Sequence, residues 1–396
     1  MAVVINGNGT VTGLAVGGLP DGIVDSGTLA TNSVDSVELI DGAVDDSHMA
    51  SIKGRKNLII NGAMQVAQRG TSSTSTGYQT VDRWNAGNNV STTKSQVAIT
   101  SGDAFDAGFR HALKLENTGA ISDTAAHYVS CFYRIEAQDL AKSGWNYKSA
   151  SSYITISFWV KSSVAGTYNV NPQSQDGTQK VYPQTFSLSA DTWTKVEKSF
   201  SGHSSITFDN DTGRGMELHI SPFYGTNFTD SGVSTSAWSD YGSATRFPDY
   251  VQNWGASTGA TWEITGVQVE LGSTATDFEH RSYGEELALC QRYYQRFVSD
   301  ASYTAFGVVR AADSTNCKGV LTYRTTMRAS PTFAQSNTGV NVGPQSAVTS
   351  IGTTYAGKDC AWVDLTSSGA SLTAGQAVVW NANNNAAAYV ELNSEL

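Results

Sequence analysis

The most regular pattern in the sequence is an alternation of apolar and polar residues between positions 153 and 163. In YITISFWVKSS, Ile154, Ile156, Phe158 and Val160 fall on one face of an extended chain, and the residues between them fall on the other. A period of two predicts a half-buried antiparallel strand. Residues 192–202, 215–225 and 261–272 alternate in the same way. Many strands separated by Gly, Asn, Asp and Ser predict a sandwich or barrel, and residues 55–280 suit one large jelly-roll β-sandwich.

A helical pattern follows the predicted sandwich, in HRSYGEELALCQRYYQRFV. Ser282 precedes Glu285 by three residues, which is the spacing of a capping box that satisfies two backbone N–H groups. Apolar residues then recur at helical spacing, at Leu287, Cys290, Tyr294 and Phe297. We predict a helix from about Tyr283 to Val298, within a connecting segment 281–299. Its apolar side chains pack either on the sandwich or on copies of themselves around a threefold axis.

The last part of the chain returns to strand patterns. GVLTYRTTMRASPTF, CAWVDLTSSGASLT and QAVVWNANNNAAAYVELN combine β-branched and aromatic residues with polar turns. Residues 300–396 are therefore predicted to form a small separate β-domain, and the chain as a whole is predicted to be mainly β.

A repeat of ten residues occupies the region before the sandwich, within residues 1–54. Its apolar positions fall in register three times, at Val24, Val34 and Val44 and at Leu29, Leu39 and Met49. Each copy has too few apolar residues to offset the entropy lost on ordering it. Such repeats become stable when they stack on copies of themselves. We therefore expect these six residues to pack in the shaft of a homotrimer, with a flexible acidic linker as the alternative.

Composition narrows the classes of function. Only 15% of the residues are charged and the net charge is −10, which argues against a surface that binds nucleic acid or anionic membranes. No run of 18 apolar residues is present, and the N-terminus does not read as a secretory signal. We expect assembly in a host cytoplasm, without membrane insertion. The four cysteines are widely spaced and are expected to be buried free thiols.

Three stretches carry a resemblance to a known family. KNLIINGAMQVAQRG with YQTVDRW, then ITISFWVKSSVAGTYNV, then VQVELGSTATDFEHRSYGEELALCQRYYQR resemble, in this order, a domain of phage tail-fibre and receptor-binding proteins. The match covers roughly residues 55–300. The opening INGNGTVTGL and the repeat resemble the start of many such fibres. This resemblance implies that residues 1–54 attach to other virion tail proteins and form a trimeric shaft.

The first strand of the predicted sandwich also resembles carbohydrate-binding modules that open with a similar motif. Asn57, Asn61 and Gly62 match that motif. In those modules this region often holds a structural calcium ion, whose ligands are carboxylate and carbonyl oxygens. Gln65 stands at the position of the acidic residue, so neither the ion nor any other cofactor or metal is predicted.

The sequence offers no marked catalytic constellation. Glycoside hydrolysis needs two carboxylates across a cleft. Glu217, Asp240, Asp249 and Glu263 are candidates, but no spacing marks a pair among them. In FDNDTGRG, Asp209 and Asp211 suit a turn better than a calcium loop. No nucleophile-elbow or zinc motif occurs, so we expect a protein that is not an enzyme.

The candidate binding segment is SAWSDYGSATRFPDYVQNWGASTG, residues 236–259, whose aromatic residues follow neither strand nor helix spacing. Long irregular segments often carry function. Exposed rings can stack on a sugar while polar neighbours bond its hydroxyl groups. The residues predicted to bind a glycan are Trp238, Tyr241, Asp249, Tyr250, Asn253 and Trp254. Alternatively, these rings pack in the sandwich or between subunits.

Together these observations predict a homotrimeric virion appendage, a phage tail fibre that attaches to the host by binding a surface polysaccharide. Two other functions remain open. One is a purely structural tail or capsid component, and the other is a tailspike that cleaves glycans.

Overall fold

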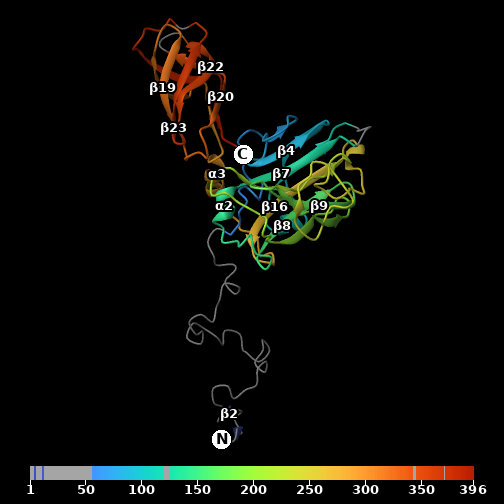
Figure 1. Cartoon of the computed structure of the whole chain (residues 1–396). Coiled ribbons are helices and arrows are strands. Elements are labelled where there is room, and N and C mark those ends of the chain that lie inside the picture. The colour runs from blue at the N-terminus through green and yellow to red at the C-terminus, as the bar shows by residue number, and fades with distance from the viewer. Residues whose placement is uncertain (1–3, 6–10, 13–55, 120–124, 342–344, 370) are drawn as a thin grey trace. The chain divides into compact units, whose positions relative to one another are not determined.

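The computed structural model describes residues 4–5, 11–12, 56–119, 125–341, 345–369 and 371–396 (Figure 1). The chain divides into two compact units, Met1–Gly54 and Arg55–Leu396. In the first unit, β1 (Val4–Ile5) and β2 (Val11–Thr12) pair in antiparallel orientation. The shaft positions predicted in the repeat lie outside the described residues: Val24, Val34, Val44, Leu29, Leu39 and Met49.

Two antiparallel sheets form the first part of the second unit, and they make the β-sandwich that the alternation predicts. One sheet has the order β14-β7-β13-β9-β10-β15, with β4 beside β7 and β11 beside β9. Its strands are β4 (Trp84–Asn88), β7 (Tyr128–Glu136), β9 (Gly166–Ser174), β10 (Lys180–Val181), β11 (Gln184–Leu188), β13 (Arg214–His219), β14 (Phe223–Tyr224) and β15 (Ser239–Asp240). The other has the order β12-β8-β16-β6-β5-β3. Its strands are β3 (Ser72–Ser73), β5 (Thr92–Ala98), β6 (His111–Asn117), β8 (Tyr153–Ser162), β12 (Thr194–Ser201) and β16 (Thr261–Leu271).

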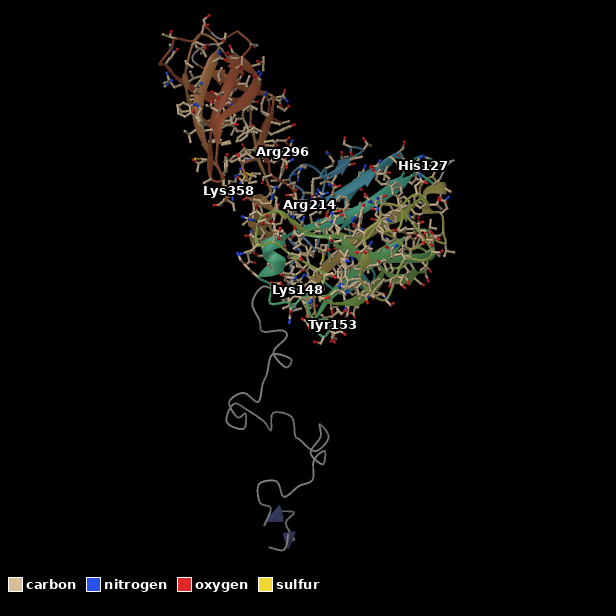
Figure 2. The ribbon with its side chains drawn as sticks, viewed as in Figure 1. His127, Lys148, Tyr153, Arg214, Arg296 and Lys358 are labelled. Atoms are coloured by element: carbon tan, nitrogen blue, oxygen red, sulfur yellow. The ribbon has the colours of Figure 1, made fainter. Side chains whose placement is uncertain are left out.

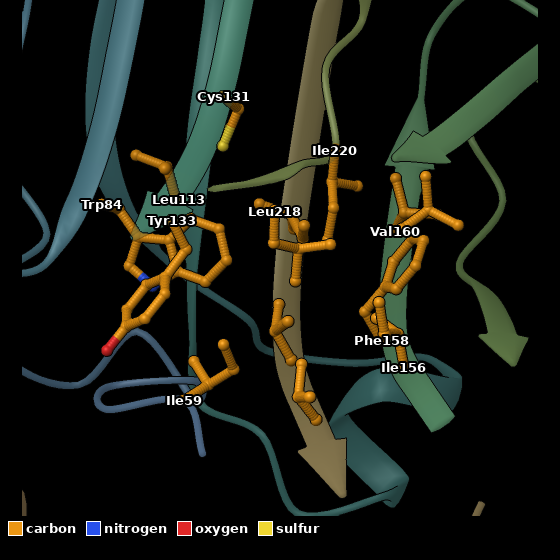
Figure 3. Close-up of a cluster of buried hydrophobic side chains, with 14 of the residues drawn as sticks. Ile59, Trp84, Leu113, Cys131, Tyr133, Ile156, Phe158, Val160, Leu218 and Ile220 are labelled. Atoms are coloured by element: carbon orange, nitrogen blue, oxygen red, sulfur yellow. The ribbon is translucent and has the colours of Figure 1, made fainter. Parts of the chain in front are cut away.

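The core lies between these two sheets. Ile156, Phe158 and Val160 of β8 are fully buried and belong to the same cluster as Tyr133 of β7 and Leu218 of β13 (Figure 3). The inward face of β8 is therefore the face that its period of two predicts. Burial of these side chains contributes roughly 1.5–3 kcal/mol each.

The helix is shorter than its sequence pattern suggests. α3 spans Tyr283–Gln291, and its capping box between Ser282 and Glu285 is present. The prediction that it continues to Val298 is wrong, because β17 (Tyr294–Val298) pairs with β25 (Tyr389–Asn393). The apolar residues spaced three or four apart therefore lie on two different elements, because the second half of the segment pairs as a strand with residues far along the chain.

The four predicted helix-packing residues consequently divide between two structures. Leu287 and Cys290 lie on α3 and pack against the sandwich core, while Tyr294 and Phe297 lie on β17. Tyr294 is buried and its hydroxyl donates to Glu391 on the neighbouring β25 at 2.5 Å. The described chain also contains two short α-helices, α1 (Asp103–Asp106) and α2 (Ala137–Ala141), and a 3₁₀ helix, Trp254–Ala256. No helix among the described residues is long and apolar enough to cross a membrane.

Residues after β17 form a second core. β18, β19, β23, β22, β21 and β24 close into a barrel, and β20 joins β17 and β25 in a small sheet. The bounds are β18 (Ala305–Ala311), β19 (Asn316–Thr322), β20 (Thr332–Ser336), β21 (Thr338–Asn341), β22 (Gln345–Ala356), β23 (Cys360–Ser367) and β24 (Ala377–Ala382). This is the small C-terminal β structure that the sequence predicts.

A buried cation connects the end of the chain to the sandwich. The Arg83 guanidinium is fully buried, lies 3.4 Å from the ring centroid of Tyr293, and forms an ion pair with Glu395. Its Nη2 also donates to the backbone carbonyl of Arg134 at 2.7 Å. Nearby, Arg296 of β17, labelled in Figure 2, donates to the backbone carbonyl of Arg69 at 2.7 Å. Polar groups of the sandwich thus contact β17, which precedes the barrel, and Glu395, which follows β25.

Removing the carboxylate of this buried pair should destabilise the second unit strongly. In Glu395→Gln the Arg83 cation stays buried without its counter-charge, and we expect a loss of about 3–5 kcal/mol in the free energy of unfolding, measured by urea titration. Glu197→Gln is the control, because Glu197 pairs with Lys195 at the exposed surface and such pairs contribute about 0–1 kcal/mol. Equal effects of the two substitutions would contradict this assignment.

A second buried carboxyl predicts the pH dependence of stability. Burial raises the pKa of Asp82 from 3.8 to about 6, although Arg69 opposes the shift. The folded chain therefore binds this proton more tightly than the unfolded chain, and the stability that Asp82 contributes is largest below pH 4 and is lost as the pH rises through 6. The loss is on the order of 3 kcal/mol. Urea titrations from pH 4 to 7 should show the stability of the wild type falling relative to Asp82→Asn; a constant difference would refute the assignment.

Candidate functional site

The aromatic segment 236–259 lies largely against the sandwich. Trp238 is 7% exposed, Trp254 is fully buried, and both belong to the main core cluster. Their indole N–H groups donate to the backbone carbonyls of Ser201 at 2.7 Å and Thr261 at 3.1 Å. The prediction that Trp238 and Trp254 lie at the surface of a loop is therefore wrong. A buried indole with its N–H satisfied is a packing residue.

Tyr241 takes part in a separate arrangement. It follows β15, which pairs with β10, and its hydroxyl accepts a hydrogen bond from Arg246 Nη1 at 2.7 Å. The Arg246 guanidinium lies within about 6 Å of four ring centroids, those of Tyr224, Phe228, Tyr241 and Phe247. Tyr241 therefore contacts the Arg246 cation, and it is not among the residues that line the hollow at Asp249 and Tyr250.

Three of the six predicted glycan-binding residues do lie together. Asp249, Tyr250 and Asn253 line an open hollow with a volume of about 310 Å³. The other lining residues are Phe223, Tyr224, Gly225, Thr226, Thr229, Val251 and Gln252. We refer to this feature as the 223–253 hollow.

Two chain segments far apart in the sequence meet at this hollow. β14 pairs with β7 through Phe223 and Val129, and the chain that follows β14 reaches segment 247–253 at Thr229. Thr229 and Phe247 form an isolated parallel bridge, and the Thr229 hydroxyl donates to Asp249 Oδ1 at 2.6 Å. One oxygen of the exposed Asp249 carboxylate is thereby held in place, and the group stays accessible.

The ring of Tyr250 is held from three sides. Its hydroxyl donates to the backbone carbonyl of Ser221 at 3.2 Å. The ring centroid lies 6.3 Å from that of Tyr168, edge to face, and 6.4 Å from that of Phe223. Burial raises the pKa of Tyr250 well above its ordinary value.

Gln252 and Asn253 are fixed by backbone groups. The Gln252 amide accepts from Thr167 N at 2.9 Å and donates from Nε2 to Thr167 O at 2.8 Å. Gly166 permits this approach, because a Cβ there would lie 2.3 Å from Gln252 Oε1. Asn253 Oδ1 accepts from Ala256 N at 3.0 Å, which caps the short 3₁₀ helix Trp254–Ala256. The polar side chains that line the hollow are thus already held by hydrogen bonds, and the exposed apolar residue Val251 lies at its rim.

The acidic residues considered for catalysis are dispersed. Glu217 lies 2.7 Å from Arg134, Glu263 lies 3.1 Å from Lys161, and Asp240 forms an ion pair with Lys180. Asp249 is the sole carboxylate among the residues that line the hollow. The two facing carboxylates that glycoside hydrolysis uses are not assembled in this hollow.

The motif residues shared with carbohydrate-binding modules have structural partners. Asn61 Nδ2 donates to the backbone carbonyls of Val66 at 2.8 Å and Asp82 at 3.0 Å, and its Oδ1 accepts from Val66 N at 3.0 Å. Gly62 lies so close to β16 that a Cβ would meet Val267 O at 2.1 Å. Within the described ranges no group of three or more His, Cys, Asp or Glu residues is placed to hold a metal ion.

The cysteines divide three to one. Cys131, Cys290 and Cys317 are buried free thiols, as expected from their spacing, whereas Cys360 is exposed. The prediction of burial is therefore wrong for Cys360, which lies at the start of β23 opposite Thr322.

Sequence reasoning missed one wall of the hollow, residues 223–229. The sequence places Phe223 and Tyr224 in a strand, but nothing local shows that Thr229 will bridge to Phe247 eighteen residues later. In the sequence, only the polar residues beside the aromatic ones in residues 249–253 point to this hollow.

No model of a known protein family matches the chain, and no curated protein matches it. Several solved structures are similar in part. A Bacteroides thetaiotaomicron protein described as a putative sugar-binding protein is 15% identical, covers 55% of this chain and 100% of its own, and has a TM-score of 0.31. The C-terminal family 22 carbohydrate-binding module of a Clostridium thermocellum protein is 13% identical over 53% of this chain and 98% of its own, with a TM-score of 0.27.

The N-terminal cellulose-binding domain of a Cellulomonas fimi β-1,4-glucanase is 9% identical, covers 53% of this chain and 99% of its own, and has a TM-score of 0.27. These three solved structures are thus described as a putative sugar-binding protein, a carbohydrate-binding module and a cellulose-binding domain. Likenesses at these TM-scores carry no weight for what the hollow binds.

The amide of Gln252 should stabilise the wall of the hollow locally. Gln252→Ala removes two hydrogen bonds to Thr167, each contributing about 0.5–1.5 kcal/mol. We expect the Thr167 amide to exchange its hydrogen roughly 5- to 100-fold faster, measured by native-state hydrogen exchange. Val251→Ala, a change in an exposed neighbour, should leave that rate unaltered. Unchanged exchange in Gln252→Ala would show that the wall is held by other contacts.

Proposed function

We propose that this chain binds a glycan through the 223–253 hollow. The observation that supports this most is the convergence of a fixed aromatic ring, Tyr250, with an exposed carboxylate, Asp249, and the amides of Gln252 and Asn253. A sugar presents an apolar face to a ring and hydroxyl groups to acceptors and donors. Because the polar groups are already held by Thr229, Thr167 and Ala256, little ordering is needed on binding.

Binding without cleavage is the proposed activity. The carboxylates Glu217, Glu263 and Asp240 each have a basic partner on other parts of the sandwich, and Asp249 is alone in the hollow. An acid and a base on opposite sides of a glycosidic bond are what a tailspike would need.

The biological setting we propose is a virion appendage that attaches a phage to a host surface polysaccharide. Residues 1–54 would join it to other tail proteins, and three copies would act together through the repeat. Three weak sites on one assembly bind a repetitive polysaccharide far more tightly than one site does. The repeat in the sequence supports this setting.

A purely structural role in the virion is the second candidate. It is favoured by one observation, that Trp238, Phe247 and Trp254 of segment 236–259 are packing residues of the sandwich. In that case the segment covers the sheet, and the hollow beside it binds no ligand.

The test is a binding titration of the full chain against purified bacterial O-polysaccharides and capsular polysaccharides, with dextran as a neutral reference. Asp249→Ala should weaken binding by about 10- to 100-fold, because a hydrogen bond to a charged group contributes about 1.5–3 kcal/mol. Asp230→Ala removes the same charge from an exposed residue of the neighbouring segment that does not line the hollow, and it should bind as the wild type does. Absence of binding to every polysaccharide would favour the structural role.

A further inference from the structure

Two exposed aromatic side chains lie next to each other on the outside of the barrel. Trp362 of β23 is 43% exposed and Tyr355 of β22 is 74% exposed. They are register partners across the two strands, so their side chains leave the sheet on the same face, about 4.5–5.5 Å apart at Cβ. On the other side of β23, Trp362 pairs with the exposed Val320 of β19. We refer to Val320, Tyr355 and Trp362 as the 320–362 platform.

The platform lies on one side of the barrel. β19, β23 and β22 are consecutive neighbours, and the three side chains form a single row across them (Figure 1). The opposite side of the closed barrel belongs to β24, which is three strands away from β23 in either direction. A ligand can therefore contact the whole row from one side.

The folding of the barrel does not explain the exposed rings. The next residue along β23, Val363, points inward and is fully buried in the barrel core. In the sandwich, Trp238 and Trp254 are buried and donate their indole N–H groups to backbone carbonyls. Within the described residues, by contrast, no hydrogen bond of the protein uses the indole N–H of Trp362 or the hydroxyl of Tyr355. Both rings therefore offer an apolar surface and a polar group to a ligand.

A row of polar side chains runs beside the platform. Asp364 lies two residues after Trp362 on the same face of β23, and its carboxylate accepts a hydrogen bond from the Thr354 hydroxyl of β22. Lys318, the register partner of Asp364 on β19, places its Nζ 3.1 Å from Asp364 Oδ1. An ammonium group has three donors, and a hydroxyl group can also accept. Lys318 and Thr354 are thus held in place and can still bond to sugar hydroxyl groups.

The size and surroundings of the platform favour a few sugar rings over a protein partner. The two aromatic side chains together expose roughly 250 Å². A standard protein interface buries about 800 Å² on each partner, and its core is depleted of charged residues. Here Lys318 and Asp364 lie directly beside Trp362. A pyranose matches this arrangement, because it presents an apolar face to a ring and hydroxyl groups at its edge to polar side chains.

We propose that the 320–362 platform binds an extended β-1,4-linked glycan with equatorial hydroxyl groups, a chain of glucose or N-acetylglucosamine. In such a chain both faces of every pyranose ring carry only C–H groups, so successive rings can lie flat on Trp362 and Tyr355. Their hydroxyl groups point sideways, toward Lys318 and Thr354. The site is separate from the 223–253 hollow, and it does not rest on the function proposed for that hollow.

Calorimetric titration of the full chain with cellohexaose and with chitohexaose tests the platform. We expect the wild type to bind at least one of them. The affinity should fall about 10- to 100-fold in Trp362→Ala, because a few aromatic anchors supply most of the energy of a binding site. Tyr355→Ala should weaken binding in the same direction. Absence of binding of both oligosaccharides to the wild type, or equal affinities of the wild type and Trp362→Ala, would overturn the proposal.

Tyr303→Ala is the matched control, because Tyr303 is also an exposed aromatic residue and lies before β18, outside the row. It should bind the oligosaccharide as the wild type does, and circular dichroism should show the same fold for all variants. Light scattering without sugar tests a protein partner on the same surface. Self-association of the wild type that is lost in Trp362→Ala would assign the platform to a second copy of the chain and contradict the proposal.

The Asp249→Ala variant separates the platform from the hollow. Weaker oligosaccharide binding in Trp362→Ala with unchanged binding in Asp249→Ala supports the platform, whatever the hollow binds. The reverse result, with binding lost in Asp249→Ala and kept in Trp362→Ala, shows that the oligosaccharide occupies the hollow, and the proposal for the platform is then wrong.

Discussion

The buried Arg83 guanidinium is the interaction on which the joint between sandwich and barrel depends. An unpaired cation in a protein interior costs several kcal/mol, so this group requires its partners to be in place. Those partners come from distant parts of the chain: Tyr133 of β7, Tyr293 after α3, and Glu395 near the last residue. The strands β17 and β25 that lead into and out of the barrel pair with each other beside this cluster. The barrel is thus inserted between two strands that the sandwich holds.

The same principle shapes the 223–253 hollow. The polar side chains of its walls mostly bond to backbone groups, as Gln252 does to Thr167 and Asn253 to Ala256. Buried rings such as Trp254 and Phe247 anchor the segment from below. The segment is therefore anchored at several points although its sequence has neither strand nor helix spacing, and the Asp249 carboxylate stays exposed. Walls held by such contacts and accessible polar groups suit recognition of a small polar ligand.

The sequence predicts what local spacing determines. The alternation from Ile154 to Val160 predicts the buried face of β8, and Ser282 with Glu285 predicts where α3 begins. The sequence-based prediction fails where pairing with a distant segment determines the secondary structure. Tyr294 and Phe297 continue the helical spacing, yet they lie in a strand because they pair with residues 389–393. Trp238 and Trp254 do not follow strand or helix spacing, because they belong to an irregular segment. Each packs separately into the core of the sandwich. Residue types in the sequence select Asp249, Tyr250 and Asn253, which line the hollow, whereas the wall from Phe223 to Thr229 depends on a bridge between segments that no local pattern reveals.

A crystal structure of the chain with a bound oligosaccharide, prepared from whichever surface polysaccharide binds it, tests the central claim most directly. The account predicts a sugar ring against Tyr250 and hydroxyl groups within hydrogen-bond distance of Asp249 and Asn253, with the walls of the hollow unmoved. A sugar bound elsewhere, on the outer face of the sandwich or on the barrel, with the 223–253 hollow empty, would contradict it.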